Sequence, residues 1–595
     1  MLTLALFALA VSTPEASAAE ADVQAFLDGY DSLYQRLYTL DANASWDAAT
    51  DVSPLNEGRA TAASQATAAF IGDPVLIASA RAWKARAAEL TPLQVRQLDA
   101  ILFDAGAAPG DQTPLVNARL AAETRLRGVQ DAFEYCLGER DAVGVCAKPA
   151  RANDIDERLR ESVDPAERLR VWTEAKRIGV PLRTGLADLR DLRNDVARKS
   201  GYSSYFGYMV SEYGMTADEM MTLLDGLNRD MAPLYKELHI WTRRKLAAKY
   251  GQPVPTGDIP AHWLPNRWGQ EWGGLVDGVD LDPYFKDRKP EWTTQAAEQF
   301  YVSMGFPKLP PVFWEKSDLF PVPEGQSRHK NSHASAWHLD LATDIRSLMS
   351  IEPNAEWFGT AHHELGHIYY YVSYTRPEVP LTLRRGANRA FHEGIGELAN
   401  VAAFQPAYLK QMGILPKAYK VDPTKQLLKE ALEQTVAFVP FATGTMSRFE
   451  YELYEKNLPA DQFQTKWWSI VSQYQGIGVP DPSRLTDPTL CDGCTKTHII
   501  DDPAGYYDYA LATVLKYQLH EHIATNILKE DPHNCNYYGN KEVGAFIKDI
   551  LEKGATEDWR DVLKNATGEP LSTRAMVAHF EPLRKWLVQE NKKAK

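Results

Sequence analysis

The sequence has few cysteines and more acidic than basic residues. Five cysteines in 595 residues are too few for a small scaffold held together by disulfides. Aspartate and glutamate number 79 against 65 lysines and arginines, a net charge of −14, and such a surface repels phosphate backbones. We therefore expect no nucleic-acid partner. A hydrophobic content of 44%, without repeats or low-complexity tracts, excludes disordered and fibrous proteins and leaves a globular one.

Long apolar runs are absent except at the amino terminus. Residues 2–11 are apolar and precede Ala16-Ser17-Ala18, a small-x-small pattern typical of signal-peptide cleavage, although no lysine or arginine comes before the run. The run is too short to span a bilayer, and no other stretch is long and apolar enough. We predict a signal peptide over residues 1–18, cleaved near Ala18 and Ala19. The protein is then exported, periplasmic or secreted, and its mature form has no membrane span.

The cysteines allow two short bridges. Cys136 and Cys146 close a short loop and are expected to pair. Cys491 and Cys494 form a Cys-x-x-Cys, which is typical of a strained bridge, a redox pair or half of a zinc site. Because no second Cys-x-x-Cys exists, we favour a loop disulfide. Cys535 is then left over, either buried or free.

Strand-like alternation is scarce, and helical periodicity dominates. Apolar residues mark one helix face near the amino terminus, namely Phe26, Leu27, Tyr30, Leu33, Tyr34 and Leu37. The same periodicity runs through residues 80–102, 165–199, 217–250 and 426–455. None of the proline- and glycine-rich connectors resembles a flexible interdomain linker. We therefore predict an all-α, predominantly helical protein with one large unit over residues 19–595.

Two histidines have the spacing of a zinc site. His363, Glu364 and His367 form the pattern H-E-x-x-H. On a helix, residues i and i+4 share a face with Cβ atoms about 5–6 Å apart, so the two imidazoles can bind one Zn²⁺. The glutamate between them then lies close to a water on the metal. The alternative is a pair of surface histidines on an ordinary helix.

Two glutamates downstream could complete such a site, because a catalytic zinc needs a third protein ligand. Glu393 and Glu397 stand four residues apart in a stretch predicted to be helical. We predict Glu393 as the third ligand and Glu397 as a residue that orients a ligand histidine. The alternative is two exposed helix carboxylates, but the small residues around them permit close helix packing and favour a site. His520-Glu521-His522 lacks the i, i+4 histidines, and we interpret it as a helix surface.

These residues stand in a sequence that resembles a known family over nearly its whole length. His363–His367 followed by Phe391-His392-Glu393 is similar to the angiotensin-converting enzyme (peptidyl-dipeptidase A) family of zinc peptidases. Further matching segments follow in the family's order: Pro260-Ala261-His262, Trp268-Gly269-Gln270-Glu271-Trp272, His333-Ala334-Ser335-Ala336-Trp337, residues 383–388, Trp467-Trp468, Tyr474-Gln475-Gly476, Lys496-Thr497-His498 and Tyr506-Tyr507-Asp508-Tyr509. Because each match would otherwise be a separate coincidence, the resemblance is specific.

The resemblance implies an ellipsoidal, nearly all-helical, two-lobed peptidase. A deep central cleft divides its lobes, and an N-terminal helical lid admits oligopeptides and excludes folded proteins. The implied activity is that of a zinc-dependent dipeptidyl carboxypeptidase, which releases dipeptides from the carboxyl ends of oligopeptides. Residues 19–595 then form a single catalytic domain with one Zn²⁺ per chain, and we expect a monomer.

The resemblance also assigns roles to individual residues. Zinc is bound by His363, His367 and Glu393, and it activates the attacking water together with Glu364, which takes a proton and later delivers it to the leaving amine. The oxyanion receives hydrogen bonds from Tyr509 and His498.

Further residues are assigned to the substrate. The substrate backbone is bound by His333 and Ala334, and its terminal carboxylate is bound by Gln270, Lys496 and Tyr506, with Phe438 also assigned to substrate binding. By themselves these residues have simpler interpretations, since a lone lysine is usually a solvated surface charge and two tyrosines can be a core stripe. Their order along the chain favours the site.

The sequence departs from the family at positions that concern anions. The family has an arginine between the paired tyrosines, where this chain has Asp508, and a second arginine where this chain has Val471. Because many members of the family hold chloride with arginines, a chloride requirement is doubtful here, and we expect activity to depend little on chloride. The alignment needs one extra residue between His498 and Tyr506.

Other departures concern the cysteines and the glutamate near the zinc ligands. The family has an aspartate where this chain has Glu397. It has a cysteine at the position of Ser332, and the family's partner for Cys535 is Ala524 here. Two family disulfides are therefore expected to be absent.

Two other functions compete with this one. Another helical zinc peptidase, acting as an oligopeptidase or removing single residues, would share H-E-x-x-H but not the expected carboxylate-binding residues. An inactive module that binds peptides or a transport partner would lack a zinc ligand or Glu364, and all four residues are present.

Overall fold

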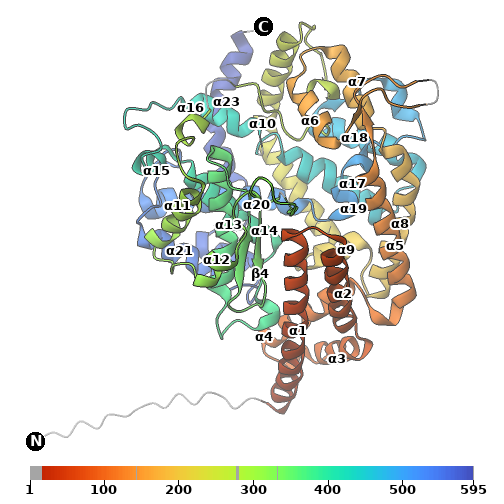
Figure 1. Cartoon of the computed structure of the whole chain (residues 1–595), viewed down its shortest axis with the longest axis vertical. Coiled ribbons are helices and arrows are strands. Elements are labelled where there is room, and N and C mark those ends of the chain that lie inside the picture. The colour runs from red at the N-terminus through yellow and green to blue at the C-terminus, as the bar shows by residue number, and fades with distance from the viewer. Residues whose placement is uncertain (1–16, 142–143, 277–279, 332, 434, 594–595) are drawn as a thin grey trace, which may run out of the picture.

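The computed structural model describes residues 17–141, 144–276, 280–331, 333–433 and 435–593. This part of the chain is predominantly helical, as the sequence predicts (Figure 1). Its strands form three short pairs: β1 (Tyr135–Cys136) with β2 (Pro149–Ala150), β3 (Ile259–Pro260) with β6 (Ile477–Gly478), and β4 (Ser335–His338) with β5 (Ile345–Leu348). The β3–β6 pair is parallel and the other two are antiparallel. No helix in the described ranges is long and apolar enough to cross a membrane.

The first helices stand together at one side of the molecule (Figure 1). They are α1 (Ala18–Thr50), α2 (Pro54–Ile71), α3 (Pro74–Lys84) and α4 (Pro92–Gly106). Each begins at a side-chain cap, Ser17, Ser53, Asp73 and Thr91 respectively, and the last three caps are followed by proline, which suits the first turn of a helix. The predicted signal peptide lies outside the described residues up to position 16.

These helices have a small hydrophobic core of their own. Leu27 and Tyr30 of α1 pack there with Leu98 and Ile101 of α4. Leu33 does not belong to the buried face of α1, because its side chain is 51% exposed, so the predicted apolar stripe is wrong at that position.

The remaining helices follow in chain order: α5 (Thr113–Ala132), α6 (Ala152–Glu161), α7 (Pro165–Ala175), α8 (Gly179–Lys199), α9 (Tyr205–Ser211), α10 (Ala217–Lys249), α11 (Pro290–Ser303), α12 (Pro311–Lys316), α13 (Ala355–Tyr374), α14 (Arg389–Ala403), α15 (Pro406–Gln411), α16 (Pro423–Leu432), α17 (Ser447–Tyr454), α18 (Phe463–Gln475), α19 (His498–Asp501), α20 (Tyr507–His522), α21 (Lys541–Leu551), α22 (Trp559–Thr567) and α23 (Arg574–Lys593).

Of the four later periodic stretches, only residues 217–250 form one helix, α10. Residues 165–199 form both α7 and α8, and a π-helical segment at Pro440–Met446 precedes α17 within residues 426–455. The stretch 80–102 is interrupted before Pro92, because proline disfavours helical geometry in the residue before it.

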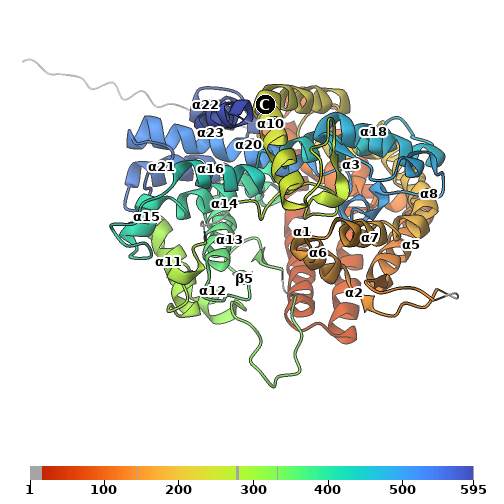
Figure 2. The same cartoon turned by 90° about the horizontal axis from the view of Figure 1, so that it is seen from above.

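Three helices meet in the main hydrophobic core and position the candidate site. α14 packs against both α13 and α20 in the interior, and both views show the three helices close together (Figures 1 and 2). A Cβ atom on Gly366 of α13 would lie 2.9 Å from the Cα of Gly396 on α14. A Cβ atom on Gly394 would lie 2.7 Å from Leu515 of α20. The expected close packing of these small residues is therefore confirmed.

The cysteines pair as predicted. Cys136 is bonded to Cys146, and Cys491 is bonded to Cys494. Cys535 is free and buried. Ser332, where the family has a cysteine, lies outside the described residues.

Candidate active site

The two histidines and one of the glutamates form a compact group. α13 places His363 and His367 on one face, where their Nε2 atoms are 3.0 Å apart. Glu393 of α14 faces them, with carboxylate oxygens 3.6 Å from the Nε2 of His363 and 4.0 Å from that of His367. Tetrahedral zinc ligands lie about 3.3 Å from one another, since each is about 2.0–2.1 Å from the metal. The three donor atoms, all within 4.8 Å of each other, therefore fit one zinc ion.

A second set of contacts orients the histidines. The Nδ1 of His363 lies 3.5 Å from Glu397, and the other carboxylate oxygen of Glu397 accepts a hydrogen bond of 2.6 Å from Lys516 of α20. Burial by itself would raise the pKa of Glu397, but Lys516 and His363 together lower it well below its usual value. The Nδ1 of His367 lies 2.8 Å from the Nδ1 of His392. In zinc sites, such contacts fix which ring nitrogen faces the metal.

Lys516 and His392 have no role in the site predicted from the sequence. His392 directly precedes Glu393, and Lys516 follows Tyr509 by seven residues, two turns of the same helix. Both spacings could have indicated a contribution to the site.

Glu364 is buried beside this group. Its Oε2 atom has no hydrogen-bond partner among the described residues. Burial raises the pKa of its carboxyl to about 7. A carboxyl with that pKa can accept and release a proton near neutral pH.

Three aromatic rings lie next to one another at the start of α20. The ring centroid of Tyr506 is 5.0 Å from that of His498 and 5.3 Å from that of Tyr509. Burial lowers the pKa of His498 to about 4 and raises that of Tyr509 to about 12, with the Glu393 carboxylate among the groups that contribute to the latter shift. At neutral pH, His498 is therefore uncharged and Tyr509 keeps its hydroxyl proton, so each has a hydrogen to donate.

A second polar cluster joins three residues that are distant in the sequence. The side-chain oxygen of Gln270 accepts hydrogen bonds from Lys496 at 2.9 Å and from Tyr506 at 3.4 Å. The Lys496 ammonium also lies 4.3 Å from the ring centroid of Trp268. Burial, and next Arg267, lower the pKa of Lys496 to about 7. The structure thus brings together all three residues predicted to bind a carboxylate.

The other predicted substrate residues surround this arrangement. The ring of Phe438 lies 5.9 Å from that of Tyr506. His333 is exposed, and its electrostatic effect on Glu364 and Glu393 indicates that it lies near them. Ala334 immediately precedes β4, which is held against α13 by a 3.2 Å hydrogen bond from Tyr371.

The two anion-related departures are both buried. Val471 lies in the main core on α18. Asp508 accepts a hydrogen bond from Tyr213 and lies 3.4 Å from Arg389, the first residue of α14. Burial raises the pKa of Asp508, and Arg389 opposes that rise.

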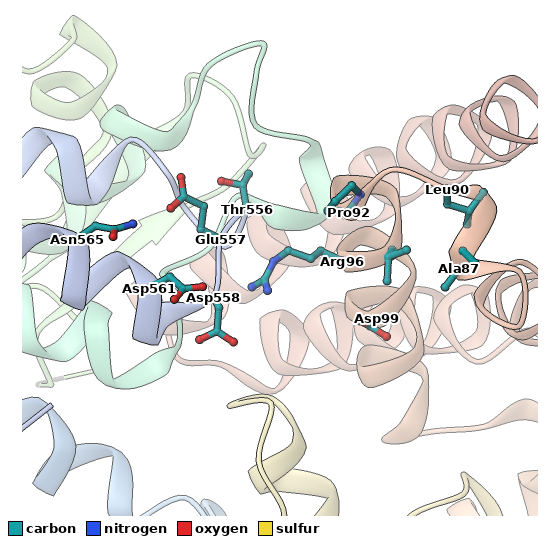
Figure 3. Close-up of a pocket in the computed structure, with 12 residues that line it drawn as sticks. Ala87, Leu90, Pro92, Arg96, Asp99, Thr556, Glu557, Asp558, Asp561 and Asn565 are labelled. Atoms are coloured by element: carbon teal, nitrogen blue, oxygen red, sulfur yellow. The ribbon is translucent and has the colours of Figure 1, made fainter. Parts of the chain in front are cut away.

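A surface pocket lies apart from these groups. It is found between α4 and the segment that leads into α22, is lined by Arg96 and several acidic residues, and includes none of the predicted site residues (Figure 3).

His520 does not lie on a helix surface, and the interpretation from the sequence is wrong for this residue. It is buried and hydrogen-bonded to Tyr537 and to the carbonyl of Pro532, because α20 is covered on several sides.

Comparison with known proteins agrees with this geometry. The family described as angiotensin-converting enzyme, peptidase family M2, matches residues 17–595. Angiotensin-converting enzyme of Rattus norvegicus is 29% identical over 97% of this chain, but the match covers only 44% of that longer protein. An angiotensin-converting enzyme-related protein of Drosophila melanogaster is 32% identical over 73% of this chain and 71% of its own length. The angiotensin-converting enzyme-like protein Ace3 of Mus musculus is 29% identical over 96% of this chain and 77% of its own length.

The family match covers far more than half of the sequence and includes both α13 and α14. The chain belongs to the angiotensin-converting enzyme family of peptidases.

Proposed function

We propose that this protein is a zinc-dependent dipeptidyl carboxypeptidase that releases dipeptides from the carboxyl ends of oligopeptides. One observation carries the proposal. The protein combines a group suited to zinc with a buried cluster suited to a carboxylate, and Tyr506 of that cluster contacts Gln270 and also packs against Tyr509. Peptidases of other kinds need the first feature but not the second.

His363, His367 and Glu393 would hold the zinc. Bound there, zinc would polarise the scissile carbonyl and lower the pKa of a water molecule at its open position. Glu364 would take the proton from that water and pass it to the leaving amine. Its unpartnered, buried Oε2 and its pKa of about 7 support this role.

Tyr509 and His498 would donate hydrogen bonds to the oxygen on which negative charge develops. Their expected protonation states at neutral pH support this assignment. A single donor of this kind typically contributes about 10²–10³ in turnover.

The Lys496 cluster would bind the terminal carboxylate of the peptide. The ammonium of Lys496 has a neutral partner, Gln270, so a substrate carboxylate would supply the missing negative charge. The separation of this cluster from the metal group would set the length of the released product. The backbone around Ala334 and the ring of Phe438 would align the remaining residues of the substrate.

Product analysis tests this function against its alternatives. We would digest an amino-terminally blocked tripeptide and a decapeptide and identify the products by mass spectrometry, with and without a chelator. Dipeptides lost in succession, only without chelator, are expected. Internal fragments would instead indicate an oligopeptidase, single amino acids a carboxypeptidase, and no products a binding module.

We further propose that residues 19–595 form one catalytic domain of an exported, monomeric protein. Light scattering of the secreted protein and its amino-terminal sequence test these points. A dimer, or an amino terminus still at Met1, would contradict them.

A further inference from the structure

Arg389 lies where three segments of the candidate site meet. It is the first residue of α14, one helical turn before Glu393. Its two terminal nitrogens donate to both carboxylate oxygens of Asp502, at 2.8 and 2.7 Å. Its Nε lies 3.4 Å from the carboxylate of Asp508. Paired hydrogen bonds of this kind fix direction as well as distance.

Each of its two partners belongs to a segment that carries an expected oxyanion donor. Asp502 follows the short helix α19, and its backbone N–H donates to the carbonyl of His498 at 3.0 Å. Asp508 directly precedes Tyr509 on α20. One guanidinium therefore connects the helix of Glu393 to the segments of both donors.

A second bridge runs in parallel through Tyr213. Its hydroxyl donates to Asp508 and accepts the backbone N–H of Ala390 at 3.1 Å. Asp508 keeps an acceptor oxygen whether or not it is protonated, so these contacts do not depend on its charge. The cluster is tightly packed: a Cβ atom on Gly505 would lie 3.2 Å from the guanidinium of Arg389.

We propose that Arg389 is a positioning residue. Through Asp502 and Asp508 it holds His498 and Tyr509 at a set distance from the metal ligand Glu393. Among the described residues, no hydrogen bond or ion pair joins it to the metal group or to the Lys496–Gln270 contact, so its effect falls on turnover rather than on substrate binding. This inference rests on the proposed function, in which those two residues stabilise the oxyanion.

The test compares variants of the full chain loaded with zinc. Arg389→Met removes the positive charge and the paired hydrogen-bond donors of the guanidinium but keeps a long side chain. Arg389→Lys keeps the positive charge without the paired donors. Arg158→Met is the matched control, because Arg158 also pairs with both oxygens of one carboxylate, Glu167, at similar exposure. For each protein we would measure zinc content, melting temperature, kcat and KM on the blocked tripeptide, and the affinity of a phosphinic analogue of that tripeptide.

A displacement of catalytic groups by about 1 Å can lower the rate about 10²-fold. We therefore expect the kcat of Arg389→Met to fall about 10²-fold, while its KM changes less than about threefold. Zinc content should stay at one per chain. The phosphinic analogue, which mimics the oxyanion, should bind more weakly by the same factor as kcat/KM, whereas the product dipeptide should bind as before. Arg389→Lys should recover part of the loss, and adding Asp502→Asn to Arg389→Met should cost little more.

The proposal is overturned if Arg389→Met keeps the parent kcat and the parent affinity for the phosphinic analogue. It is also overturned if its losses track zinc content or melting temperature as they do in Arg158→Met. Failure of the proposed function would look different, because the parent protein would then release products other than dipeptides. The binding of the phosphinic analogue needs no turnover, so it decides the role of Arg389 in either case.

Discussion

The proposed metal group (His363, His367 and Glu393) and the proposed carboxylate-binding cluster (Gln270, Lys496 and Tyr506) are built in opposite ways. Two of the three residues proposed to bind the metal are four positions apart on one helix, so the backbone hydrogen bonds of α13 already set their spacing. The carboxylate-binding cluster joins Gln270 to two residues more than 220 positions away. The metal group is therefore mainly local in sequence, and the carboxylate-binding cluster forms only in the tertiary structure. We expect substitutions in and beside the metal group to abolish catalysis, and substitutions in the cluster to alter selectivity for the carboxyl end of the peptide.

The largest effect should come from Glu364. Glu364→Ala should keep about one zinc per chain and lose about 10²–10⁴ of the turnover, because the residue moves protons without binding the metal. His363→Ala and Glu393→Ala should lose zinc and activity together. Metal analysis and kinetics of the purified variants check this. Full zinc occupancy and full activity in Glu393→Ala would remove that residue from the ligand set.

The carboxylate-binding cluster is tested by substrates with a free or an amidated carboxyl end. Amidation should lower kcat/KM of the parent enzyme, and Lys496→Ala should erase most of the difference. A hydrogen bond to a charged group contributes about 1.5–3 kcal/mol, which is about 10- to 150-fold in kcat/KM. Equal cleavage of acid and amide by the parent would show that the cluster does not bind the chain end.

The same cluster should make end recognition depend on pH. The pKa of free Lys496 is lowered to about 7, chiefly by burial and then by Arg267, while Glu271 and Asp156 act in the opposite direction. The charged ammonium binds a carboxylate, so the preference for the acid over the amide should be full below that pKa and should decline as pH rises through it. Lys496→Arg should keep the preference to higher pH, since arginine stays charged. An acid-to-amide ratio independent of pH in the parent would contradict this.

The smallest effect should come from chloride. Asp508 is itself an acidic group and contacts Arg389 and Tyr213, and the side chain of Val471 has no hydrogen-bond donor. Neither position is therefore suited to bind a free anion. Activity should change less than about twofold between sodium chloride and sodium acetate at matched ionic strength, apart from screening common to both salts. A several-fold rise specific to chloride would show that other basic residues form an anion site.

Several elements could be predicted because their cause is local. Periodicity predicted the helix α10 almost to its ends, and the pattern H-E-x-x-H predicted two residues of the metal group. Periodicity failed at Leu33, which faces solvent, because the number of neighbours around α1 is not a local property. The interpretation of His520 as part of a helix surface, made because that segment lacks i, i+4 histidines, was also wrong, since its hydrogen-bond partners come from residues that follow α20.

The sequence by itself determined the helical class, the spacing of His363 and His367, and the pairing of Cys136 with Cys146, all of which depend on residues close together in the chain. It favoured the Cys491–Cys494 bridge over a redox pair or half of a zinc site, and the structure decided between them. Only the tertiary structure decided that Lys516 would support Glu397, and that Arg389 would join the segments of His498 and Tyr509. Those contacts depend on how α14 and α20 pack, and packing is set by the close approach of small residues such as Gly394 rather than by the spacing of the polar residues.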